Sequence, residues 1–204
     1  MTVYRRRRGN LPLAVTLLMV GLFVVAASLG HVGGGWRLPT WSTGAVDAAA
    51  AMRPSRPASL SIPSLGVHTG VNPVGLDADG AIAAPPLERA YEAGWYADSP
   101  SPGQEGAAII VGHVDDASGP AVFHDLGSLM PGDRVEVTRE DGRVAVFEVT
   151  DVRQYDKEYL PPEEVFTAAG RPELRLITCG GQWVGGDVGY TDNIVVFAVL
   201  VDSR

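Results

Sequence analysis

Short runs of alternating apolar and polar residues, closely spaced and separated by turn residues, most constrain the fold of this chain. The clearest pair is DRVEVTRE and RVAVFEVTDV, which lie on either side of Asp141-Gly142. An Asp-Gly dipeptide between two alternating runs is the strongest short-range signal of a β-hairpin. We therefore expect two antiparallel strands joined by a tight turn in this region.

Further strand-like runs lie on both sides of this hairpin. They are LSIPSLGVHTGV (60–71), which predicts two short strands turning at Pro63 and Gly66, AAIIVGHVD (107–115), PELRLITCGG (172–181) and DNIVVFAVLV (192–201). We expect a glycine-rich loop from Gly180 to about Tyr190, and short helices only within 121–129 and 161–166. Eight or so strands too closely spaced for intervening helices predict an antiparallel or mixed β-barrel. The fold class is therefore mostly β.

The first 57 residues have a different character. Arg5 to Arg8 are consecutive arginines, and residues 11–30 contain no charged side chain. An uncharged run of about 20 residues can cross ~30 Å of hydrocarbon as a helix, and flanking arginines favour a cytoplasmic N-terminus. We expect a basic cytoplasmic tail (1–10), a transmembrane anchor in the lipid bilayer (11–30), a flexible extracellular stalk (31–57) and a folded extracellular domain (58–204). A cleaved signal peptide is the alternative, with small residues near 26–28 at the cut site.

Charge is divided unevenly along the chain. Residues 1–57 contain seven arginines and one acid, whereas residues 58–204 contain nine basic and 23 acidic residues. An acidic domain repels phosphate backbones, so we expect no nucleic-acid partner for the folded part. A cationic or neutral partner suits this domain better.

Cys179 is the only cysteine of the chain, so no internal disulfide accounts for it in an exported protein. It ends an apolar run and precedes Gly180 and Gly181, which places the thiol at the mouth of the predicted barrel. The alternative role is that of a small buried hydrophobic side chain. A nucleophilic thiol needs a nearby base or proton donor, and His113 follows Gly112 at the end of another predicted strand.

The other histidines fit this partnership less well. His31 lies in the predicted stalk, His68 in a strand or turn, and His124 in a predicted short amphipathic helix. We expect His68 and His124 to be surface or packing residues. One cysteine and dispersed histidines lack the spacing of metal ligands, so we expect no metal and no cofactor.

Taken together, several motifs resemble those of the sortase family, and in detail its actinobacterial class F. They are VGHVD (111–115), LITCGG (176–181), SIPSLGV (61–67), GWY (94–96), GDRVEV (132–137) and YTDNIVVFA (190–198). The resemblance extends from about Leu60 to Val201. It implies a closed eight-stranded sortase-type β-barrel and a thiol transpeptidase that acts on proteins carrying an LPXTG-type sorting signal.

The resemblance also implies a role for individual residues. Cys179 would attack the carbonyl of the signal's threonine to form a thioacyl enzyme, and His113 would protonate the departing glycine amine. The acyl group would pass to an amine acceptor, expected to be a peptidoglycan precursor of the cell wall, or to water. Substrate-binding positions by the same resemblance are Thr178, Gly180, Gly181 and Tyr190.

The sequence departs from the family pattern at one position. Sortases generally carry an arginine on the strand after the cysteine loop, but here no Lys or Arg lies between Cys179 and Ser203. The matching region places Thr191, Asp192 or Asn193 near that position, and an amide from Asn193 could donate a hydrogen bond to an oxyanion. Arg175, Arg89 and Arg153 are weaker substitutes from elsewhere in the fold.

Two other functions remain open from the sequence. One is a thiol protease or hydrolase that uses Cys179 and His113 without an amine acceptor. The other is a non-catalytic envelope domain that uses the barrel as a binding module, which the absent arginine would suit.

Overall fold

The computed structural model describes residues 49–168, 170–186 and 189–204. The expected cytoplasmic tail (1–10), the expected anchor (11–30) and most of the expected stalk lie outside these residues. Among the helices that the structure describes, none is both long and apolar enough to cross a membrane.

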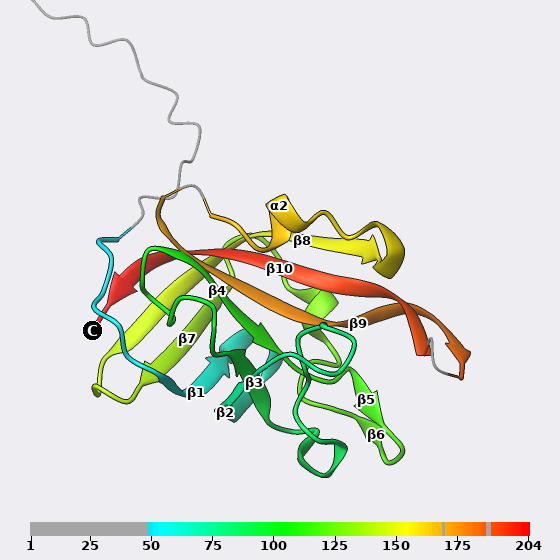
Figure 1. Ribbon diagram of the computed structural model, residues 1–204. Helices are drawn as coiled ribbons and strands as arrows, with labels where there is room; N and C mark the ends of the chain where they lie inside the picture. Colours follow the sequence, from blue (N-terminus) through cyan, green and yellow to red (C-terminus); the bar gives the residue numbers. More distant parts are fainter. Residues whose placement is uncertain (1–48, 169, 187–188) are drawn as a thin grey trace, which may run out of the picture. The chain divides into compact units, whose positions relative to one another are not determined.

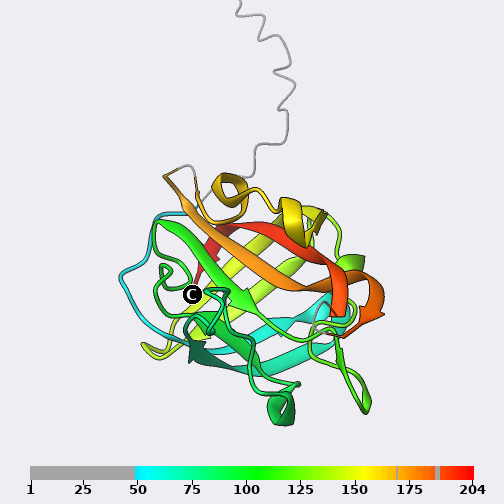
Figure 2. The ribbon, with the colours of Figure 1, turned by 45° about the vertical axis from the view of Figure 1, so that its right-hand side comes forward.

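Eight strands form a closed barrel, as Figures 1 and 2 show. In chain order they are β1 (Pro57–Ile62), β2 (Val67–Val74), β3 (Ala93–Tyr96), β4 (Gly106–Val111), β7 (Arg134–Arg139), β8 (Val144–Asp156), β9 (Pro172–Gly185) and β10 (Gly189–Ser203). Around the barrel the order is β1-β2-β3-β4-β9-β10-β8-β7. The pairs β2/β3 and β4/β9 are parallel and the remaining pairs are antiparallel. The predicted mixed, mostly β barrel is confirmed.

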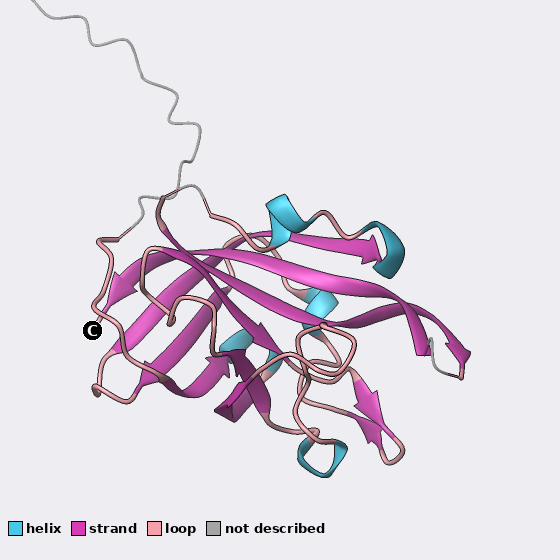
Figure 3. Ribbon diagram, in the orientation of Figure 1, coloured by secondary structure: helices cyan, strands magenta, loops and turns pink. Residues whose placement is uncertain are grey.

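The remaining elements are small and lie in the connections, as Figure 3 shows by secondary structure. A separate two-stranded ribbon contains β5 (Asp115–Asp116) and β6 (Gly119–Pro120). The helical segments are η1 (Pro63–Leu65), η2 (Leu87–Arg89), η3 (Leu126–Ser128), η4 (Lys157–Tyr159) and α2 (Pro162–Val165). Short helical segments form within both predicted ranges, η3 within 121–129 and α2 within 161–166, although His124 precedes η3. The expectation that they form only there was wrong, because η1, η2 and η4 form in other connections.

The predicted hairpin at Asp141-Gly142 is present, and it shows why alternation selects this fold. Gly142 has a φ of 80°, a left-handed conformation that glycine adopts without steric cost. Val135 and Val137 on β7 are fully buried, while Glu136 between them and Thr138 after them are not. Alternation therefore sends one face of the hairpin into the barrel and leaves the other outside.

The barrel interior is filled by large apolar side chains from every side. Those with no exposed surface include Leu60, Ile62, Ile110, Phe123, Leu126, Phe147, Leu174, Leu176 and Leu200. Burying each such side chain contributes about 1.5–3 kcal/mol. On the outer face of β10, Val165 from α2 covers Val195 and Phe197.

The segment before β1 packs against the barrel. The amide of Ala49 donates to Leu200 at 2.8 Å, and Met52 is buried in the core cluster. Arg139, whose side chain has no exposed surface, donates to the carbonyls of Arg53 and Pro102 and pairs with Asp141. A buried guanidinium thus fastens this segment to the end of β7.

The expected loop from Gly180 to Tyr190 is mostly strand. β9 continues to Gly185 and β10 begins at Gly189, so the two strands form one long hairpin. The glycines at 180 and 181 do not end the strand, and their missing side chains leave room for residues of the neighbouring β10. A Cβ on Gly180 would lie 2.7 Å from the side chain of Ile194 on the neighbouring strand.

Candidate active site

The parallel pairing of β4 with β9 brings His113 and Cys179 together. Val111 lies opposite Ile177, and the amide of Gly112 donates to the carbonyl of Ile177 at 3.1 Å. His113 and Cys179 each lie two residues beyond this matched pair. Because side chains alternate along extended chain, both point to the face that Val111 and Ile177 share, outside the barrel core. Cys179 lies within β9 and not at a strand end as predicted, while His113 follows the end of β4. The pairing of these strands therefore brings an imidazole and a thiol 66 residues apart in sequence to one place.

Gly112 makes this arrangement possible. A Cβ at this position would lie 2.6 Å from Phe123 Cδ2 and 2.7 Å from Val122 Cγ1. The backbone before His113 therefore runs directly against the buried Phe123. The position of His113 is tied to the packing of the core.

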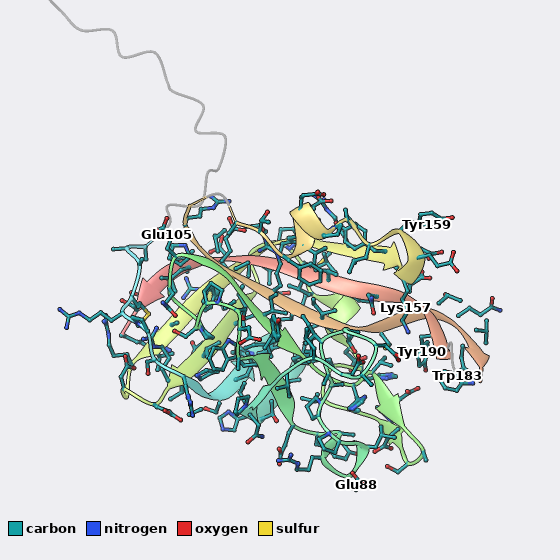
Figure 4. All side chains as sticks on the ribbon, viewed as in Figure 1. Glu88, Glu105, Lys157, Tyr159, Trp183 and Tyr190 are labelled. Carbon is teal, nitrogen blue, oxygen red and sulfur yellow. The ribbon has the colours of Figure 1, made fainter. Side chains whose placement is uncertain are left out.

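Both side chains line a pocket of about 660 Å³. The residues around it are Leu87, His113, Val114, Asp115, Asp116, Ala117, Lys157, Cys179, Trp183, Gly189 and Tyr190. Figure 4 shows Lys157, Tyr190 and Trp183 at the same end of β9 and β10. Cys179 is partly exposed, neither sealed in the core nor fully open to water. A thiol in this position is accessible to a substrate.

One ring nitrogen of His113 has a defined partner. Nε2 lies 2.6 Å from the carbonyl oxygen of Pro85. A carbonyl oxygen can only accept, so Nε2 carries a hydrogen. In the neutral ring this leaves Nδ1 as the nitrogen that can accept a proton. The hydrogen bond to Pro85 thus selects the tautomer with hydrogen on Nε2, and Nδ1 is the ring nitrogen left to take up and give back a proton.

Tyr190 and Asp115 connect two walls of the pocket. The hydroxyl of Tyr190 donates to the carboxylate of Asp115, and the Tyr190 ring meets Trp183 edge-on with centroids 5.0 Å apart. The hydrogen bond to Asp115 raises the pKa of Tyr190, and burial and the electrostatic interactions with Asp115 and Cys179 raise it further. The phenol therefore remains protonated and a donor at neutral pH.

Asp116 adds a second carboxylate beside the pocket. Hydrogen bonds from the hydroxyl and amide of Ser118 lower the pKa of Asp116, more than burial raises it. The amide of Gly119 and the nearby charge of His113 act in the same direction. This wall of the pocket is therefore anionic at neutral pH.

The other predicted site residues, Asn193, Thr178, Gly180 and Gly181, do not line the pocket. Asn193 lies opposite Cys179 in the β9–β10 register, so both point to the same face. Thr178 is 4% exposed, on the opposite face from Cys179. A Cβ at Gly181 would lie 2.5 Å from Asp192 Cγ. This glycine therefore allows the backbone two residues after Cys179 to approach β10 closely.

The three arginines considered as substitutes lie elsewhere. Arg175 is buried against Glu173 at 2.7 Å and over the ring of Phe197. Arg153 pairs with Asp151 at 2.6 Å, and it and Arg175 border a separate surface depression. Arg89 pairs with Glu92, also outside the pocket lining. Among the described lining residues, Lys157 is the only lysine or arginine.

Sequence reasoning missed several of the pocket residues. Asp115 was visible as the last residue of VGHVD, two positions after His113, but nothing local marked it as a partner of Tyr190. Lys157 is the only lysine of the chain, and it reaches the pocket because β8 pairs with β10. No signal in the sequence near Lys157 indicates that neighbourhood.

The fold and the site together define a β-barrel enzyme with a thiol and an imidazole at one pocket. A model of the sortase domain matches residues 60–201. The chain therefore belongs to the sortase family and is an enzyme of the sortase transpeptidase type. The family acts in general on proteins that carry sorting signals.

Solved sortases have the same fold. A lid mutant of sortase A from Corynebacterium diphtheriae is 24% identical, with a TM-score of 0.56, and the match covers 74% of this chain and 73% of that one. The sortase D5 transpeptidase from Clostridium perfringens is 21% identical, with a TM-score of 0.53 and coverage of 72% and 79%. Sortase C1 from Streptococcus agalactiae is 20% identical, with a TM-score of 0.56 and coverage of 71% and 67%. Among curated proteins, no sequence matches the chain.

Proposed function

We propose that this protein is a cysteine transpeptidase that cleaves an LPXTG-like sorting signal and transfers the cleaved protein to an amine of the cell wall. The observation that carries the proposal is the pocket that Cys179, on β9, and His113, just beyond the end of β4, share beside this pair of parallel strands. A thiol and an imidazole in one accessible pocket are the minimum machinery for acyl transfer through a thioester.

The proposed reaction has two halves. The Cys179 thiolate attacks the carbonyl carbon of the signal's threonine, and the tetrahedral intermediate collapses with cleavage of the amide C–N bond. His113 gives a proton to the departing glycine amine. The acceptor amine then attacks the thioester, returns a proton to His113, and releases Cys179 as the C–S bond breaks.

The charge of the site favours an amine as the acceptor. Asp115 and Asp116 lie along one wall of the pocket, and the domain from residue 58 onward is strongly acidic. Such a field attracts a protonated amine before it loses its proton to the base. We therefore propose an amino group of a peptidoglycan precursor as acceptor, in place of water.

Two side chains are candidates to stabilise the oxyanion of the tetrahedral intermediate. Asn193 lies opposite Cys179 on the neighbouring strand, and its amide would be a neutral donor. Lys157 lines the pocket itself and carries a positive charge. Removing an oxyanion donor typically lowers the rate about 10²–10³-fold. Rates of Asn193→Ala and Lys157→Met would show which residue has this role.

Location and subclass follow from the sequence alone and are part of the proposal. The uncharged run at residues 11–30 after Arg5 to Arg8 supports a single-pass anchor with a cytoplasmic N-terminus and an extracellular catalytic domain. The motifs from SIPSLGV to YTDNIVVFA support class F.

The test uses the full chain in detergent with an LPXTG-type peptide, with and without triglycine. We expect a mass adduct on Cys179 and a product that carries triglycine. Cys179→Ala and His113→Ala should each abolish product, while His68→Ala, an exposed histidine on β2 outside the pocket, should not. Product that forms equally well with Cys179→Ala would refute the proposal. Cleavage that ignores triglycine would instead establish a hydrolase.

A further inference from the structure

Tyr190 occupies a constrained position at the tip of the β9–β10 hairpin. It lies opposite Trp183 in the strand register, next to Gly189, which has a φ of 64°. Its ring rests edge-on against Trp183. Because both rings line the pocket that contains Cys179, the hydroxyl of Tyr190 is aimed across the pocket from the thiol's own hairpin.

The hydroxyl reaches the segment that carries His113. It donates to Asp115, the first residue of β5, two positions after His113 and 75 residues away from Tyr190 in sequence. Figure 1 shows the ribbon of β5 and β6 beside the ends of β9 and β10. This contact joins the hairpin of the nucleophile to the segment of the base.

Backbone contacts also hold the segment between β4 and β5, since the carbonyl of Val114 accepts from the amide of Ala121 at 3.0 Å and lies 3.1 Å from His124 Nδ1, and β5 pairs with β6. On the barrel side, the amide of Gly112 donates to Ile177, and the amide of Phe123 donates to the His113 carbonyl at 2.9 Å. These bonds hold the backbone before and at His113. The Tyr190–Asp115 bond adds the contact that joins the side chain two positions after His113 to the β9–β10 hairpin. Together they fix the chain on both sides of the imidazole.

We propose that Tyr190 and Asp115 form a positioning pair that holds His113 at working distance from Cys179. The inference rests on the proposed function, since it assigns a role within that reaction. It differs from a substrate-binding role for Tyr190, because Tyr190 acts on His113 through Asp115. A misplacement of about 1 Å between reacting groups can cost about 10²-fold in rate, so one hydrogen bond in this place has a large effect on catalysis.

The raised pKa of Tyr190 supports a hydrogen bond to Asp115 that stays formed at neutral pH. Its hydrogen bond to Asp115 raises the pKa of Tyr190, as do burial and the electrostatic interactions with Asp115 and Cys179. The donor proton therefore stays on the phenol throughout the neutral range. The hydrogen bond to Asp115 therefore keeps its donor at neutral pH.

The experiment compares Tyr190→Phe, Asp115→Ala and Asp115→Asn in the full chain. Phe keeps the ring contact with Trp183 and removes the hydroxyl. Asn keeps an acceptor oxygen for that hydroxyl, whereas Ala removes it. Tyr91→Phe is the matched control, since Tyr91 is 63% exposed and does not line the pocket.

Two rates are measured for each variant. One is kcat and KM for an LPXTG-type peptide with triglycine, and the other is the rate at which iodoacetamide alkylates Cys179. The second needs no substrate, and it reports the pairing of thiol and imidazole directly. Wild type and His113→Ala define the two ends of its range.

We expect Tyr190→Phe and Asp115→Ala each to lower kcat about 10–100-fold with KM within about twofold, and to slow alkylation toward the His113→Ala value. Asp115→Asn should recover most of the rate. The double variant that combines Tyr190→Phe with Asp115→Ala should lose no more activity than either single variant, as expected for two residues that act through one contact. Tyr91→Phe should match wild type.

Three results would overturn the inference. One is a rise in KM with kcat unchanged, which would make Tyr190 a substrate contact. Another is a lower melting temperature with both rates unchanged, which would make the bond structural only. The third is additive losses in the double variant. If wild type alkylates rapidly but cleaves no peptide, the proposed function fails while the positioning pair is still tested by alkylation.

Discussion

Replacing Gly112 with alanine tests the link between core packing and the site. The added Cβ would lie 2.6 Å from Phe123 Cδ2, 2.7 Å from Val122 Cγ1 and 2.9 Å from Phe123 Cε2, where ordinary contacts begin near 3.4 Å. Gly112 does not have a positive φ, so the whole effect is steric. Phe123 has no exposed surface and cannot move into solvent. The chain at Gly112 must therefore shift by somewhat under 1 Å.

This shift has two measurable consequences. Overpacking of a core typically costs about 1–3 kcal/mol, which for a domain of this size lowers the melting temperature by roughly 2–12 °C. The neighbouring His113 moves with the backbone, so kcat/KM should fall by roughly 10–100-fold. Thermal unfolding by circular dichroism and peptide cleavage below the transition measure the two effects separately.

The control is Gly70→Ala on β2. A Cβ at Gly70 meets no heavy atom within 4 Å, and its φ is not positive. Stability there should change by no more than about 1 kcal/mol, in the stabilising direction, and activity should be that of wild type. If Gly112→Ala behaves like Gly70→Ala in both assays, the tie between core packing and His113 is wrong.

Two further predictions concern buried charge. Arg139→Met should lower the free energy of unfolding by about 2–4 kcal/mol, because it leaves the carbonyls of Arg53 and Pro102 without their donor; an unchanged urea midpoint would contradict this. For Glu173, burial raises the pKa, but hydrogen bonds from Arg171 and Arg175 outweigh burial and hold it below its ordinary 4.5. A carboxyl with a lowered pKa stabilises the fold above its ordinary pKa, and this contribution disappears as pH falls through the lowered value. Glu173→Gln should therefore lower the melting temperature at pH 7 and approach wild type in acid, and an equal loss at both pH values would count against the ion pair.

Local patterns predicted much of the fold. The Asp141-Gly142 hairpin, the two short strands around Pro63 and the apolar first half of β9 up to Cys179 all follow from alternation and turn residues. Boundaries were less predictable. The stretch from Gly180 to Gly185 looks like a loop by composition, yet it is strand, because glycine there makes room for Ile194 and Asp192 on β10.

The candidate site likewise contains residues that local sequence patterns indicated and residues that they did not. A lone cysteine before two glycines and a histidine after one glycine are local features, and they were enough to select Cys179 and His113. Asn193, chosen by its place in the strand after the cysteine, does lie opposite Cys179. Thr178 lies next to Cys179 in sequence but on the other face, which alternation could have indicated.

Sequence by itself indicated most of the strands and the two candidate reactive side chains, since both depend on neighbours within a few positions. Tertiary structure alone decided what surrounds those groups. Lys157 enters the pocket, Arg175 is kept out of it, and Tyr190 meets Asp115 through strand order and register across the barrel. Contacts between residues 75 positions apart exist only after the barrel closes, and no local pattern encodes them.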